Sequence, residues 1–127
     1  MTDEEREARK ADLEKQKCAA EGVRNHYQDI LDKLQNYQSE LNTEDTNMNT
    51  DFDYARNYNL IGNDDWYGVQ EGYAKDHVAS ISAYFDSYNN EIYVLKQQID
   101  QAILNICNMI AQMNEKISIL QSQIDSL

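Results

Sequence analysis

The sequence predicts an all-α protein that folds as a long antiparallel two-helix hairpin with the character of a coiled coil. The chain has no Pro and only four Gly among 127 residues, so little interrupts a helix. Apolar residues also recur every seven positions on both sides of the middle of the chain. Because this length suits one domain, we expect a single helical-hairpin domain over residues 1–127.

The first helix is predicted over about residues 3–57. Its main apolar series has a spacing of seven and consists of Leu13, Ala20, Tyr27, Leu34, Leu41, Met48 and Ala55. Three residues after members of that series stand the companions Val23, Ile30 and Tyr37. This pattern indicates one seam along the helix. The opening segment is rich in charge and poor in apolar residues, so the order of roughly the first 12 residues stays open.

The second helix is predicted over about residues 66–126 and carries a stronger pattern. Its main series is Val78, Phe85, Ile92, Ile99, Ile106, Met113, Leu120 and Leu127. Its predicted companions are Ile81, Tyr88, Leu95, Ala102 and Met109. The two series would bury against each other in a hairpin.

The reversal between the helices is predicted near Tyr58–Asp65. Gly62 or Asn63 can end the first helix in the left-handed conformation, and Asp64 or Asp65 can cap the second. With Gly62 as the pivot, the two arms nearly match in length. That register places Tyr37 opposite Tyr88 and Ile30 opposite Leu95.

A third apolar stripe widens the C-terminal half of the second helix and predicts a partner-binding surface. Its members are Ile103, Ile110, Ile117 and Ile124. In the predicted register they face the charged segment 1–17, which offers little apolar cover. The predicted partner-binding residues are Ile103, Ile106, Ile110, Met113, Ile117, Leu120 and Ile124. A second copy of the chain in a homodimer and a different helical protein are both open as the cover.

Residue types that usually carry chemistry are sparse. The predicted register keeps His26 and His77 too far apart to share a metal. Cys18 and Cys107 stand at one level of the hairpin, but the heptad phase turns both away from the seam, so we expect reduced thiols. With no phosphate-binding loop, nucleophile elbow or Cys-x-x-Cys pair, we expect no enzyme and no cofactor.

The formal net charge of −12 is concentrated near the predicted reversal. Between Glu40 and Asp76 stand nine acidic residues and two basic ones. Such a field repels phosphate backbones, so we expect no nucleic-acid partner. The first residues lack the pattern of a signal peptide, and no later segment has the length of an apolar membrane span. We therefore expect a cytoplasmic protein without membrane insertion.

The tripeptide Trp66-Tyr67-Gly68 stands between the two predicted arms. A hairpin of two helices with Trp-x-Gly in the turn resembles the WXG helical-hairpin superfamily of type VII (ESX) secretion, whose motif Trp66 and Gly68 match. No Tyr-x-x-x-Asp/Glu export signal follows the second helix. In this respect the chain is most similar to the small helical partners, or Lap-type targeting factors, of LXG-domain toxins in Gram-positive bacteria.

That resemblance implies a non-enzymatic targeting factor or chaperone. It would bind the helical LXG domain of a type VIIb secretion toxin, alongside a possible second small helical partner, and help deliver the toxin to the secretion machinery. Export together with the toxin is left open. The alternative interpretation is a self-associating structural coiled coil, for example a component of phage or cell-envelope assembly, in which Trp-x-Gly is coincidental.

Overall fold

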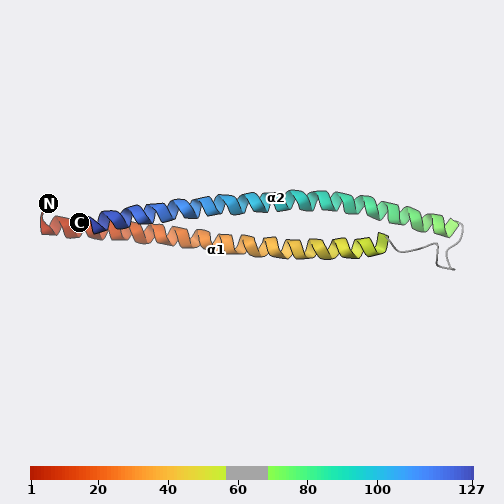
Figure 1. The fold of residues 1–127 in the computed structure, drawn as a ribbon, viewed down its shortest axis with the longest axis horizontal. Helices are drawn as coiled ribbons and strands as arrows, with labels where there is room; N and C mark the ends of the chain where they lie inside the picture. The colour runs from red at the N-terminus through yellow and green to blue at the C-terminus, as the bar shows by residue number, and fades with distance from the viewer. Residues whose placement is uncertain (57–68) are drawn as a thin grey trace. The chain divides into compact units, whose positions relative to one another are not determined.

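The computed structural model describes residues 1–56 and 69–127, and in these ranges the chain forms two α-helices (Figure 1). Helix α1 spans Asp3–Arg56 and helix α2 spans Val69–Asp125. The predicted all-α helical-hairpin fold is confirmed. The predicted reversal at Tyr58–Asp65 lies outside the described residues.

Helix α1 begins with a reciprocal capping box at Thr2 and Glu5. The Glu5 backbone N–H donates to Thr2 Oγ1 at 3.1 Å, and the Thr2 backbone N–H donates to Glu5 Oε2 at 3.0 Å. Asp3, Glu4 and Glu5 form an acidic first turn, which the positive end of the helix dipole favours. The charged opening segment is therefore helical from Asp3 onward, although it lacks an apolar stripe.

The chain divides into two compact units. The terminal unit comprises Met1–Tyr37 and Ile99–Leu127, and the central unit comprises Gln38–Gln98. Each unit contains part of α1 and part of α2. Each is therefore a short pair of helices that can be described by itself.

In the terminal unit, two side-chain hydrogen bonds join the helices. Lys17 Nζ donates to Gln121 Oε1 at 2.6 Å, and Arg24 Nη1 donates to Asn114 Oδ1 at 3.4 Å. A step of seven residues forward on α1 thus matches a step of seven backward on α2. The helices of this unit are antiparallel.

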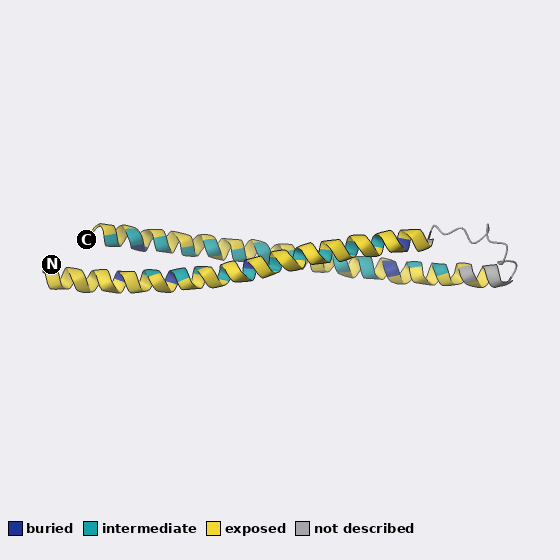
Figure 2. Cartoon of the chain, turned by 90° about the horizontal axis from the view of Figure 1, so that it is seen from below, coloured by how far each residue is buried: buried dark blue, intermediate teal, exposed yellow. Residues whose placement is uncertain are grey.

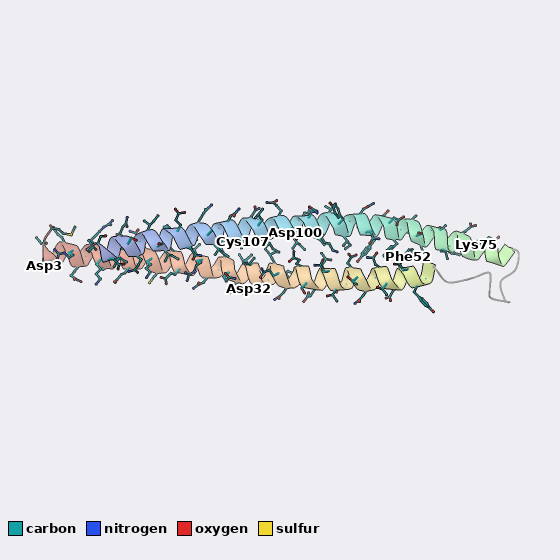
Figure 3. All side chains as sticks on the ribbon, in the orientation of Figure 1. Asp3, Asp32, Phe52, Lys75, Asp100 and Cys107 are labelled. Atoms are coloured by element: carbon teal, nitrogen blue, oxygen red, sulfur yellow. The ribbon has the colours of Figure 1, made fainter. Side chains whose placement is uncertain are left out.

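Among the described residues of the central unit, an ion pair and an aromatic stack join the helices. Lys96 Nζ lies 2.6 Å from Asp45 Oδ2, and the rings of Phe52 and Phe85 stack with centroids 4.1 Å apart and an interplanar angle of 10°. Figure 3 shows Phe52 on the side of α1 that faces α2. These helices are antiparallel as well.

The predicted register is wrong. It places Asn108 opposite Lys17, whereas Lys17 bonds to Gln121, a displacement of 13 residues from 108 to 121. It also places Tyr73 opposite Phe52, which stacks on Phe85. A heptad pattern fixes which face of each helix is buried, but the same faces still match after a slide of one or two heptads.

As a consequence of this register, the helices of the central unit are staggered. Phe52 stands one turn before the end of α1 at Arg56, yet its partner Phe85 lies well inside α2. The first turns of α2 therefore extend beyond the end of α1, and Figure 3 labels Lys75 in this part. A symmetric reversal would have left no such extension.

The companion positions of the seam also differ from those predicted. On α1 the buried companions stand four residues after the main series, at Leu31 and Phe52. Of the predicted companions, Ile30 is half-buried, whereas Val23 and Tyr37 are 42% and 60% exposed. The remaining observed companions are half-buried and polar, namely Lys17, Arg24, Gln38 and Asp45. Because those side chains are polar, the apolar pattern could not reveal them. Figure 2 shows buried and half-buried residues as a narrow stripe among exposed ones.

Candidate partner-binding surfaces

The two family-motif residues, Trp66 and Gly68, lie outside the described residues. The described surfaces that could bind a partner are those of α1 and α2. Two of them matter for partner binding: the predicted isoleucine stripe of the terminal unit, and an apolar groove in the central unit.

The isoleucine stripe belongs to the seam of the terminal unit. Leu120 is 6% exposed, and the other six predicted partner-binding residues are half-buried, namely Ile103, Ile106, Ile110, Met113, Ile117 and Ile124. All four stripe members stand four residues after a member of the main series, namely Ile99, Ile106, Met113 and Leu120, so the stripe takes the companion place for which Met109 was predicted. Met109 is instead 41% exposed.

The expectation that these isoleucines lack apolar cover on α1 is therefore corrected. The bonds from Lys17 to Gln121 and from Arg24 to Asn114 bring the stripe beside residues near 14–35 of α1, not beside the charged opening segment. That stretch supplies Ala20 and Leu31, and Leu13 next to it is only 2% exposed. The half-buried stripe thus lies in the seam between the two helices, and its role in partner binding stays a prediction.

The central unit contains an apolar groove that the sequence did not reveal. Its floor is the stacked pair Phe52 and Phe85, which are 8% and 9% exposed. Met48, Ile81, Tyr84 and Tyr88 line it together with Asp51, and the groove is shallow and open, with a volume of about 450 Å³. Tyr88 also stacks on Phe85, with centroids 5.8 Å apart.

The side chains above this floor are open to solvent. Tyr84 is 78% exposed, Ile81 is 53% exposed and Met48 is 44% exposed. Ile81, Tyr84, Phe85 and Tyr88 follow the spacing of one helical face, on which only Phe85 is buried. The sequence predicts Ile81 and Tyr88 for the seam, whereas in the structure Ile81 is open to solvent and Tyr88 is half-buried.

The terminal unit has an open hollow of similar size that no aromatic side chain lines. Its volume is about 480 Å³, and it is lined by five polar residues, Arg9, Ser118, Ser122, Gln123 and Ser126, and three apolar ones, Leu13, Ile119 and Leu127. Leu104 and Ile119 of this unit are also exposed, at 54% and 52%. The hollow with an aromatic lining described above belongs to the central unit.

Charge also separates the units. By sequence the central unit carries eleven acidic and three basic residues, a net charge of −8, whereas the terminal unit carries twelve and eight, a net charge of −4. One of the three cations of the central unit, Lys96, is bonded to Asp45. The groove thus lies in the more negative part of the chain.

The sites considered for chemistry are dispersed. Cys18 and Cys107 are both exposed free thiols, and the observed register removes them from the shared level predicted for them. His26 and His77 are exposed. Within residues 1–56 and 69–127, no three His, Cys, Asp or Glu side chains form a group that could hold a metal ion.

Comparison of the chain with protein-family models, with curated proteins and with solved structures gives no match. Neither described helix contains a stretch with the length and hydropathy required to cross a membrane. The functional interpretation of the groove in the central unit therefore rests on its geometry and its charge.

Proposed function

We propose that this chain is a non-enzymatic targeting factor or chaperone that binds the helical LXG domain of a type VIIb secretion toxin and helps deliver it to the secretion machinery. The proposal is supported by the helical-hairpin fold together with Trp66-x-Gly68 between the helices. The mechanism would be helix packing, in which the hairpin adds to the helices of its partner.

The observation that carries the proposal is the thin core of the hairpin. Among the described residues, the buried apolar side chains are Leu13, Ala20, Leu31, Phe52, Phe85 and Leu120. A small core stabilises a chain weakly, and small folds commonly gain stability by association. A partner helix that covers exposed apolar side chains such as Tyr84 and Ile81 would supply the missing burial.

Co-expression tests this proposal. The chain should co-purify with the LXG domain encoded beside its own gene, and the toxin domain should lose solubility or secretion when the chain is deleted. A gene neighbourhood without LXG toxin or secretion genes, or an LXG domain that stays separate during co-purification, would contradict the proposal.

The same thin core supports a second candidate, a self-associating structural coiled coil. A second copy could cover the exposed apolar residues in a homodimer or larger assembly. Size-exclusion chromatography with light scattering separates the candidates. A monomer that becomes stable with the toxin domain favours the targeting factor, whereas a tight homo-oligomer that ignores the toxin domain favours self-assembly.

A further inference from the structure

We infer that the groove of the central unit docks an amphipathic helix that carries basic residues beside its apolar stripe, supplied by a different protein. The groove is defined by Met48, Asp51, Phe52, Ile81, Tyr84, Phe85 and Tyr88. This inference rests on the proposed function, because it specifies where on this chain a helical partner binds and what chemistry that partner brings.

The apolar part of the groove suits the face of a helix. Phe52 and Phe85 are its buried residues, with their rings stacked on each other at an interplanar angle of 10°. Exposed side chains from both helices also line it, namely Met48 on α1 and Ile81 and Tyr84 on α2. A row of residues spaced i, i+3, i+4 and i+7 on a partner helix could lie along such a trough. Large aromatic side chains with polar tips are the residues that most often anchor such contacts.

The exposed apolar surface continues along α2 beyond the groove. Leu95 stands seven residues after Tyr88 on α2. Leu95 is 42% exposed, although it was predicted to lie in the seam. The exposed apolar surface is therefore longer than the hollow itself, which favours an elongated occupant over a small molecule.

The rims of this surface are acidic. Asp51 lines the groove, Glu44 stands seven residues before it on α1, and Glu91 stands seven residues after Tyr84 on α2. All three are exposed. None of the groove residues or of these heptad neighbours is Lys or Arg. A helix with Lys or Arg beside its apolar stripe would place its cations near these carboxylates.

This charge argues against a second copy as the occupant. The chain has a net charge of −12, so a second copy would bring like charge to the acidic rims. Its most basic stretch, at the start of α1, has only Ala8, Ala11 and Leu13 as apolar residues and offers no stripe for the groove. A basic amphipathic helix from another protein satisfies both the apolar and the charged requirements.

The test uses the full chain and synthetic helical peptides of about 18 residues. The probe is a fluorescent peptide of Leu and Lys with its leucines on one helical face. Two controls carry the same residues in scrambled order, or Glu in place of Lys. Fluorescence anisotropy should show saturable binding of the probe with a dissociation constant near or below about 10 μM, and at least about tenfold weaker binding of both controls.

Variants locate the binding site. Tyr84→Asp should weaken binding of the Leu/Lys probe at least about tenfold, and Asp51→Lys combined with Glu91→Lys should weaken it by a similar factor. Ile119→Asp is the matched control, because Ile119 is an exposed α2 residue of the terminal unit, 52% exposed. It should change the affinity less than about twofold. Circular dichroism should show unchanged helicity for every variant.

Three results would overturn the inference. They are equal binding of the scrambled or acidic peptide, unchanged binding by Tyr84→Asp, and a homodimer in light scattering that Tyr84→Asp dissociates.

Co-purification with the LXG domain tests the proposed function separately. If Tyr84→Asp still co-purifies with the LXG domain, this groove is not the partner site although the proposed function stands. If the Leu/Lys probe binds as expected but no LXG domain does, the groove inference stands and the proposed function fails.

Discussion

The terminal unit and the central unit are both antiparallel helix pairs, but they differ in how far their apolar side chains are buried. The terminal unit turns Ile103, Ile110, Ile117 and Ile124 toward its own seam, where all four are half-buried. The central unit buries Phe52 and Phe85 and leaves Tyr84 78% exposed above them. Apolar residues at heptad spacing therefore hold the helices together in the terminal unit and form a docking surface in the central unit.

The largest expected effect tests the seam of the terminal unit. Ile110→Asp places a carboxylate at a half-buried apolar position, and we expect it to lower the free energy of unfolding by about 3 kcal/mol. Thermal unfolding followed by circular dichroism measures the change. Ile119→Asp, at the 52% exposed position, should change it by less than about 0.5 kcal/mol. Equal effects of the two variants would show that the stripe is not part of the seam.

The second expected effect concerns the ion pair of the central unit. Lys96→Ala removes the cation beside the partly buried carboxylate of Asp45, which has 17% of its side chain exposed and keeps the hydrogen bond that Asn49 Nδ2 donates to its Oδ1 at 3.0 Å. The free energy of unfolding should fall by about 1 to 2 kcal/mol. Asp12→Ala removes the exposed pair with Arg9 and serves as the control, with an expected change below about 0.5 kcal/mol.

If Lys96→Ala costs no more than Asp12→Ala, the ion pair does not hold the register. Double substitution of Lys96 and Asp45 by Leu sharpens the test. It should restore most of the stability, because two apolar side chains of suitable size replace a partly buried charge pair. It should also permit sliding by whole heptads, which cross-linking between engineered cysteines on α1 and α2 would detect.

A third, smaller effect is expected at the start of the terminal unit. Thr2→Ala removes the hydroxyl that accepts the Glu5 N–H, and should lower helix stability by about 0.5 to 1 kcal/mol. Amide hydrogen exchange should accelerate in the first turns of α1 and stay unchanged in the central unit. Unchanged exchange in the first turns would show that the capping box contributes nothing there.

The smallest effect on stability is expected in the groove. Tyr84→Asp makes the same chemical change, to an aspartate, as Ile110→Asp, but at a side chain that is 78% exposed. We expect a change in the free energy of unfolding below about 0.5 kcal/mol. A loss comparable to that of Ile110→Asp would contradict the division of roles between the two units.

The sequence predicts the two helices because heptads without Pro leave few alternatives, and the main series on each helix locates part of the buried face. Leu13, Ala20, Phe85 and Leu120 belong to that series and are buried. The companion positions could not be predicted on α1, because Lys17 and Asp45 occupy two of them and their partners are polar residues of α2.

The register could not be predicted either, since equivalent heptads match after sliding and the choice depends on individual polar pairs. The predicted companion spacing also concealed the groove. A spacing of three residues assigns Ile81 and Tyr88 to the seam, whereas Ile81 is 53% exposed and both residues line the groove. Its acidic rim was noticed in the sequence only as a concentration of charge.

The polar companions Lys17, Arg24 and Asp45 have a consequence during synthesis. Helix α1 leaves the ribosome before α2, so its apolar series emerges without the helix that later packs against it. Charged side chains on that same stripe interrupt it and discourage self-adhesion of nascent chains, as gatekeeper residues do beside aggregation-prone segments. Once α2 has been synthesised, Lys17 donates to Gln121, Arg24 donates to Asn114, and Asp45 pairs with Lys96. Residues that limit association between nascent chains then connect the two folded helices.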